Sequence, residues 1–206
     1  MTRLMIIFFL ISGALSAQNP FIIVLGNVQD GGSPHIGCSR ECCSGLHESP
    51  DPDRMVVSLG LVDPSSESRY LIEATPDMPR QLQILNKYGP YGDEKTADGI
   101  FLTHAHIGHY TGLMYLGKEA LNSSGAPVFA MPRMAEYLRT NGPWSQLVKL
   151  GNIDLRMIRD GEPVHLTDKL QVTPIRVPHR DEYSETVGFF MKGPSKTALF
   201  IPDIDK

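Results

Sequence analysis

Three histidines lie within six residues of one another, directly after a short apolar run. The run is Gly99 to Leu102, and it is followed by Thr103, His104, His106 and His109. A short apolar run of this kind predicts a buried strand, and its end is where the chain turns. Imidazole is a common zinc ligand, and a catalytic zinc usually takes three protein ligands and a water. We therefore predict a metal site at the end of a buried strand.

Two later residues also follow predicted strands. His179 comes after the strand over 170–177, and Asp203 after the strand over 196–201. A single histidine is more often structural than functional, but three in this spacing are much less often accidental. The predicted metal ligands are therefore His104, His106, His109, His179 and Asp203. Asp203 and His109 are also the predicted catalytic residues: Asp203 ligates the metal or accepts a proton from the attacking water, and His109 binds a second metal or orients other groups.

The histidine segment resembles the His-x-His-x-Asp-His signature of the metallo-β-lactamase superfamily. The following Thr111-Gly112-Leu113 and the upstream segment 71–77 are also similar to that family. His179 and Asp203 fall in the order of the family's third histidine and bridging aspartate. The resemblance implies an α/β fold, the αββα sandwich of two mixed sheets flanked by helices. It extends from Phe21 to the end of the chain.

Within the superfamily, the segment 31–35 and the cysteines after it look most like the branch around the pyrroloquinoline quinone (PQQ) biosynthesis protein B. This PqqB-like resemblance implies a second possible role, that of a non-hydrolytic metal protein in coenzyme PQQ biosynthesis.

The sequence departs from the family pattern in two ways. Gly108 stands where the family has an aspartate that ligates the second metal. The chain also ends at Lys206, whereas members usually continue to a final histidine ligand, so we expect an N-terminal part of a longer protein with the C-terminal part of the fold missing. One catalytic zinc is expected, while a second site keeps only His109 and Asp203 and is weak or empty.

The three cysteines of the chain form one cluster with two interpretations. His35, Cys38, Cys42 and Cys43 offer four ligands within nine residues, which is consistent with a structural zinc. Alternatively, Cys38 forms a disulfide with Cys42 or Cys43 and one thiol is left over.

The first 17 residues have the features of a signal peptide. Arg3 precedes an apolar run over 4–15, and small residues follow at 14–17. The run is too short to span about 30 Å of hydrocarbon. We therefore expect an exported protein, periplasmic or secreted, with no stable membrane anchor and one domain over 18–206.

Composition excludes other classes of protein. A hydrophobic content of 41% and a charged content of 20% are ordinary for a soluble domain. The net charge is -4 and no block of basic residues is present, so we expect no nucleic-acid partner. The oligomeric state stays open.

The expected function is that of an exported metal-dependent hydrolase. Zinc-activated water would attack an ester, amide, lactone or phosphodiester bond of a small-molecule substrate. The alternatives are the PqqB-like role and a metal-binding remnant without activity. The sequence does not identify the substrate.

Overall fold

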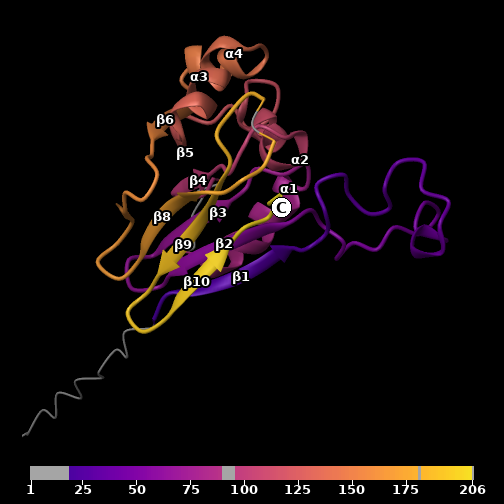
Figure 1. Cartoon of the computed structure of the whole chain (residues 1–206), viewed down its shortest axis with the longest axis horizontal. Coiled ribbons are helices and arrows are strands. Elements are labelled where there is room, and N and C mark those ends of the chain that lie inside the picture. Colours follow the sequence, from indigo (N-terminus) through magenta and orange to yellow (C-terminus); the bar gives the residue numbers. More distant parts are fainter. Residues whose placement is uncertain (1–18, 90–95, 181, 206) are drawn as a thin grey trace, which may run out of the picture.

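The computed structural model describes residues 19–89, 96–180 and 182–205 (Figure 1). The predicted signal peptide lies outside the described residues. The first sheet has the strand order β1-β2-β3-β4-β5-β6. Its strands are β1 (Phe21–Gly26), β2 (Ser58–Asp63), β3 (Ser68–Ile72), β4 (Gly99–Phe101), β5 (Ala126–Ala130) and β6 (Ile153–Met157). The strands β1 to β3 pair antiparallel and the strands β3 to β6 pair parallel, so this sheet is mixed.

The second sheet has the order β10-β9-β8-β7. Its strands are β7 (Val164–His165), β8 (Gln171–Arg176), β9 (Val187–Lys192) and β10 (Thr197–Phe200). All of its described pairings are antiparallel, whereas a mixed sheet was expected. These strands follow one another along the chain through short connections, and such connections favour antiparallel hairpins.

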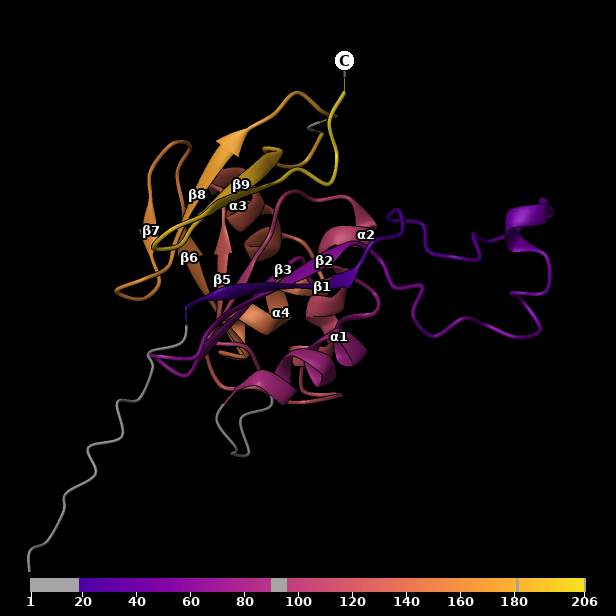
Figure 2. The same cartoon turned by 90° about the horizontal axis from the view of Figure 1, so that it is seen from below.

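Helices cover the first sheet on the side away from the second sheet. Figure 2 shows the second sheet on one side of the first sheet and α1 on the other. The α-helices are α1 (Met78–Leu85), α2 (Ile107–Tyr110), α3 (Pro132–Thr140) and α4 (Trp144–Lys149), and the 3₁₀ helices are η1 (Glu41–Cys43), η2 (Asn86–Tyr88) and η3 (Thr111–Leu116). The expected sandwich of two sheets with flanking helices is confirmed.

Both faces of the first sheet are buried at β4 and β5, and these two strands contain only apolar residues, glycine and proline. Neighbouring residues of a strand point to opposite faces. In β4, Ile100 packs with the helices, while Phe101 packs in the core between the sheets. Phe101 stacks on Phe129 at 4.3 Å between ring centroids and contacts Phe189 of the second sheet edge to face.

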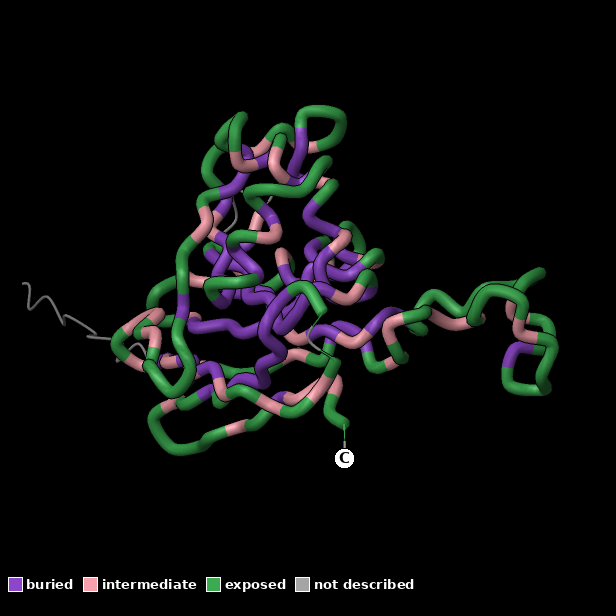
Figure 3. The backbone as a smooth tube through the Cα atoms, turned by 45° about the horizontal axis from the view of Figure 1, so that its top comes forward, coloured by how far each residue is buried: buried purple, intermediate pink, exposed green. Residues whose placement is uncertain are grey.

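The loop between β1 and β2 extends away from this sandwich. Figures 1 and 2 show it as the indigo and violet segment that projects from the body, and Figure 3 shows that most of it is exposed. Its two ends are held together by a parallel bridge between Val28 and Val56. The loop contains η1, which includes two of the cysteines.

Two details of the fold depend on contacts between distant segments. Beyond Gly151 the strands form antiparallel hairpins except for β6, which pairs parallel with β5 in the first sheet. The helices α3 and α4 form the crossover that a parallel pair requires. Asp77 precedes α1, but its side chain does not cap the helix and instead accepts a hydrogen bond from the Val56 backbone N–H at 2.8 Å.

Candidate metal centre

The ends of three strands bring four ligand side chains together. His104 and His106 follow β4, His179 follows β8 and Asp203 follows β10. Their ligand atoms all lie within 4.8 Å of one another. The structure therefore brings together residues that are up to about a hundred positions apart in the chain, at the shared edge of the two sheets.

The separations in this group match those that a tetrahedral ion imposes. Zinc bonds of about 2.0–2.1 Å place neighbouring ligand atoms about 3.3 Å apart. His106 Nδ1 lies 2.9 Å from His104 Nε2 and 3.2 Å from His179 Nε2. Asp203 Oδ2 lies 3.4 Å from both His104 Nε2 and His179 Nε2. The donor set and its spacing therefore fit a zinc-type cation.

The second nitrogen of each histidine in this group faces an oxygen atom. Thr103 Oγ1 is 2.9 Å from His104 Nδ1, and Asp205 Oδ2 is 3.2 Å from His179 Nδ1. His106 Nε2 lies 3.3 Å from Glu182 Oε2. Thr103 and Glu182 are within hydrogen-bonding geometry of His104 and His106, whereas Asp205 is near His179 Nδ1 without forming a hydrogen bond. Oxygen partners of this kind set the tautomer and the orientation of metal-binding rings.

Glu73 is a residue of this site that sequence reasoning missed. It follows β3, it is fully buried, and its φ of 76° lies in the left-handed region that side chains other than glycine rarely adopt. Its carboxylate accepts hydrogen bonds from the Thr103 N–H at 2.9 Å, from the Thr103 hydroxyl at 3.1 Å and from His109 Nδ1. The sequence signal that could have identified Glu73 is its place as an acidic residue directly after a buried apolar strand. Backbone strain tends to be concentrated at functional sites.

The titration of these groups reflects their burial and the charges around them. Burial lowers the pKa of His104 against the opposing effect of Asp203. Burial also acts to lower the pKa of His109, but the charges of Glu73 and Asp203 outweigh it and raise that pKa to about 10. The imidazoles of His104 and His109 hold the pKa of Asp203 well below its usual range. Asp203 is therefore an anion throughout the physiological range, as a metal-binding carboxylate must be.

His109 belongs to a second group of ligand atoms. Asp30, His109 and Asp203 have ligand atoms within 4.8 Å of one another. The expectation that only His109 and Asp203 remain at this position is therefore corrected. Asp30 lies in the projecting loop and is about 80 residues from His109 along the chain, so no local pattern connected the two.

The cysteine cluster contains a disulfide. Cys38 is bonded to Cys43, and Cys42 has an exposed free thiol. The Cys42 sulfur remains close to the other two, but His35 is not part of the group and its Nδ1 contacts the Ile36 carbonyl at 3.1 Å. The four-ligand zinc site is therefore not formed. The structure therefore agrees with the disulfide interpretation of the sequence, and it pairs Cys38 with Cys43.

The fold and the site define an α/β sandwich protein whose strand ends carry histidine and aspartate side chains that are arranged as metal ligands. The chain belongs to the beta-lactamase superfamily, whose domain matches residues 68–206. Among curated proteins, no sequence matches the chain. Within the described residues, no helix combines the length and the apolar character needed to cross a bilayer.

Two solved structures share the fold. The Zn²⁺-bound PqqB from Methylobacterium extorquens is similar with a TM-score of 0.71 and 22% identity, over 89% of this chain and 65% of that one. A diphosphatase from the PhnP family is similar with a TM-score of 0.61 and 22% identity, over 84% of this chain and 62% of that one. The chain thus spans less than two thirds of the length of either protein.

Proposed function

We propose that this protein is a metal-dependent hydrolase that acts on an ester, amide, lactone or phosphodiester bond of a small molecule. One observation carries the proposal: three imidazole nitrogens and one carboxylate oxygen face one another at the separations that zinc bonds of about 2.0–2.1 Å produce. A zinc ion held there would take water as a further ligand, would lower the pKa of that water to about 7 and would polarise a substrate oxygen.

The residues of the site have separate roles in this proposal. His104, His106 and His179 hold the ion through the ring nitrogens that face one another. Asp203 would act as a ligand, because its Oδ2 lies 3.4 Å from both His104 Nε2 and His179 Nε2, about the spacing that a shared ion imposes. Thr103 keeps His104 in the correct tautomer: the Thr103 hydroxyl donates to Glu73 and therefore accepts from His104 Nδ1.

Substrate would approach from the side of His106 and Asp203. The side chain of His104 is 1% exposed, whereas those of His106 and Asp203 are 14% and 25% exposed. Ile107 and Ile204, which adjoin these two residues in sequence, are exposed apolar side chains. This combination favours a substrate that carries an apolar group beside the bond that is cleaved.

Export is part of the proposal. The basic and apolar pattern of residues 1–17 supports it. The Cys38–Cys43 disulfide supports it independently, because disulfides persist mainly in oxidising compartments outside the cytosol.

A second candidate function is a non-hydrolytic role like that of PqqB in coenzyme PQQ biosynthesis. It is favoured by the similarity in fold to Zn²⁺-bound PqqB over most of this chain. The two functions differ in whether the zinc-loaded protein turns over simple hydrolysable substrates.

Activity screening of the zinc-loaded protein on ester, lactone and phosphodiester panels tests the proposal. His104→Ala and His106→Ala should each lower the activity by at least about 100-fold, since metal ligands contribute more than their outer partners do. His165→Ala, at an exposed histidine in β7, is the matched control and should leave the activity unchanged. Equal activity of the wild type and both ligand variants would contradict the hydrolase proposal.

A further inference from the structure

The absence of a side chain at Gly108 makes room for Asp30. A Cβ atom at position 108 would lie 2.5 Å from both Asp30 Cβ and the Asp30 carbonyl oxygen, and 2.7 Å from Asp30 Cα. Carbon atoms do not approach so closely, so no residue larger than glycine fits there while Asp30 keeps its position. The family's motif has a carboxylate at position 108. In this chain the space beside Gly108 is occupied instead by Asp30, which comes from another segment and also has a carboxylate.

Asp30 is held in this position by its own segment. The bridge between Val28 and Val56 fixes the chain just before it. Gln29 then closes the following turn, since its side chain accepts from the Gly31 N–H at 2.9 Å and donates to the Gly32 carbonyl at 3.1 Å. The Asp30 side chain is partly buried. Local hydrogen bonds thus hold the backbone on both sides of Asp30, and its partly buried side chain lies within reach of His109 and Asp203.

The His109 ring provides an independent sign of a ligand at this place. Its side chain is fully buried, and its Nδ1 is bonded to Glu73. Its Nε2 is buried and has no hydrogen-bond partner among the described residues, although Asp203 Oδ2 lies 3.4 Å away. Buried polar atoms are nearly always satisfied, and an exception needs an explanation such as an ion.

We propose that Asp30, His109 and Asp203 bind a second divalent cation, and that Asp30 supplies the carboxylate that position 108 lacks. Asp203 Oδ2 is 3.4 Å from His104, His179 and His109, so a single oxygen atom faces both ligand groups. Two-metal hydrolytic sites hold their ions about 3.5–4 Å apart, within reach of one shared ligand. This inference rests on the proposed function because it extends the same site from one ion to two.

Counting bound metal tests the role of Asp30 directly. Metal-free full chain is titrated with zinc, and bound zinc is measured after gel filtration. The wild type should bind two ions, and Asp30→Asn should retain one and lose affinity for the other by at least about 100-fold. Glu48→Gln, which removes an exposed carboxylate from the same loop, is the matched control and should bind two.

A second variant tests the packing between position 108 and Asp30. Gly108→Ala puts a Cβ 2.5 Å from the Asp30 carbonyl oxygen and 2.7 Å from Asp30 Cα, so Asp30 must move, and this variant should lose the second ion as Asp30→Asn does. Loading with cobalt gives a further readout on the wild type, because two ions that share one ligand couple magnetically and change the electron paramagnetic resonance spectrum.

The outcomes separate this inference from the hydrolase proposal. Binding of a single zinc by the wild type, or of two with unchanged affinity by Asp30→Asn, would overturn the assignment of Asp30. Hydrolysis by a one-zinc wild type would overturn it and leave the proposed function standing. If the wild type binds two zincs but turns over no panel substrate, the result would support Asp30 as a ligand and would count against the hydrolase proposal. If Asp30→Asn does not fold, the zinc count of the wild type decides.

Discussion

Glu73 and His109 are hydrogen-bonded to each other, and neither side chain has any exposed surface. The same carboxylate also accepts from Thr103, whose hydroxyl in turn accepts from His104 Nδ1 at 2.9 Å. One buried acid therefore orients a histidine of each ligand group. The positive φ of Glu73 places its carboxylate between β3 and the segment that follows β4.

The Glu73→Gln substitution should lower zinc affinity by about 10–100-fold, the usual effect of losing an outer partner of a metal ligand. An amide has one acceptor oxygen in place of two, so it cannot accept both from the Thr103 N–H at one end and from the Thr103 hydroxyl and His109 at the other. Competition with a chromophoric chelator measures the affinity. Glu136→Gln, at an exposed glutamate of α3, is the control, and equal affinity of the two variants would contradict the role of Glu73.

The metal-free protein should lose stability as the pH rises from 6.5 to 10. The pKa of His109 is raised from 6.5 to about 10 in the folded state. Over that interval the folded chain keeps a proton that the unfolded chain has released, so stability falls with increasing pH. Thermal unfolding at several pH values measures this effect. His109→Gln should show a shallower dependence, and identical slopes for the two proteins would rule the explanation out.

Thiol counting should find one reactive thiol per chain without reductant, both before and after unfolding. The Cys38–Cys43 disulfide leaves only Cys42 to react, and Cys42 is exposed. Treatment with a chelator should not change the count, whereas reduction should raise it to three. Release of three thiols by the chelator alone would instead favour a zinc site.

The Gly112→Ala substitution should destabilise the fold by about 1–3 kcal/mol, the usual cost of overpacking. A Cβ at this position would lie 2.1 Å from the Thr75 carbonyl oxygen and 2.8 Å from Met78 Cβ. The Gly112 N–H also donates to the Ala74 carbonyl at 2.8 Å, which keeps the two segments close. Urea unfolding measures the change, with Gly193→Ala as control because its Cβ would meet only ordinary contacts.

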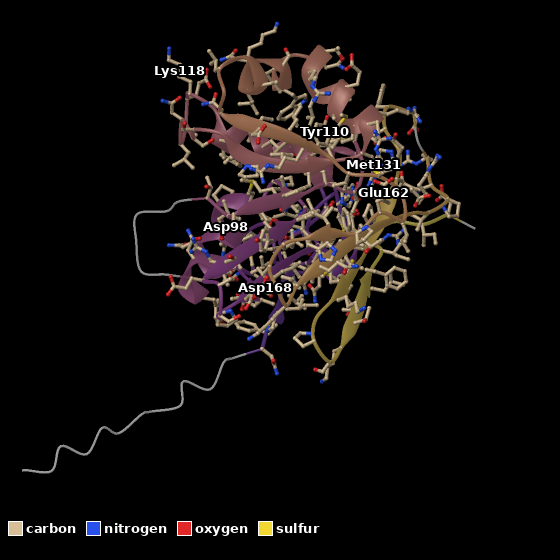
Figure 4. All side chains as sticks on the ribbon, turned by 90° about the vertical axis from the view of Figure 1, so that its left-hand side faces the viewer. Asp98, Tyr110, Lys118, Met131, Glu162 and Asp168 are labelled. Atoms are coloured by element: carbon tan, nitrogen blue, oxygen red, sulfur yellow. A yellow bond between two sulfur atoms is a disulfide. The ribbon has the colours of Figure 1, made fainter. Side chains whose placement is uncertain are left out.

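Tyr110→Phe should change stability mainly through a lost hydrogen bond, by about 1 kcal/mol. Tyr110, labelled in Figure 4, shares a 2.9 Å hydrogen bond with the Tyr137 hydroxyl and contacts the Trp144 ring. Burial and this bond raise the pKa of Tyr110. Urea unfolding of Tyr110→Phe, Tyr137→Phe and the double variant measures the pair, and fully additive effects would show that the bond contributes nothing.

The sequence by itself determined the elements and the main donor types. Strand patterns such as the apolar run from Gly99 to Leu102 before His104 are local, because side-chain alternation and apolar runs depend only on neighbouring residues. Histidines and an aspartate at predicted strand ends indicated where ligands would gather, since strand ends meet at a sheet edge. For the disulfide, the sequence left two possible pairings, Cys38 with Cys42 or Cys38 with Cys43.

Only the tertiary structure decided which distant segments meet. The parallel pairing of β6, the burial of Glu73 beside His109 and the approach of Asp30 to Gly108 all join residues far apart in the chain. Such contacts depend on how elements pack together, and no local periodicity encodes them. The glycine at 108, which by itself indicated a lost ligand, takes its meaning from the residue that packs against it.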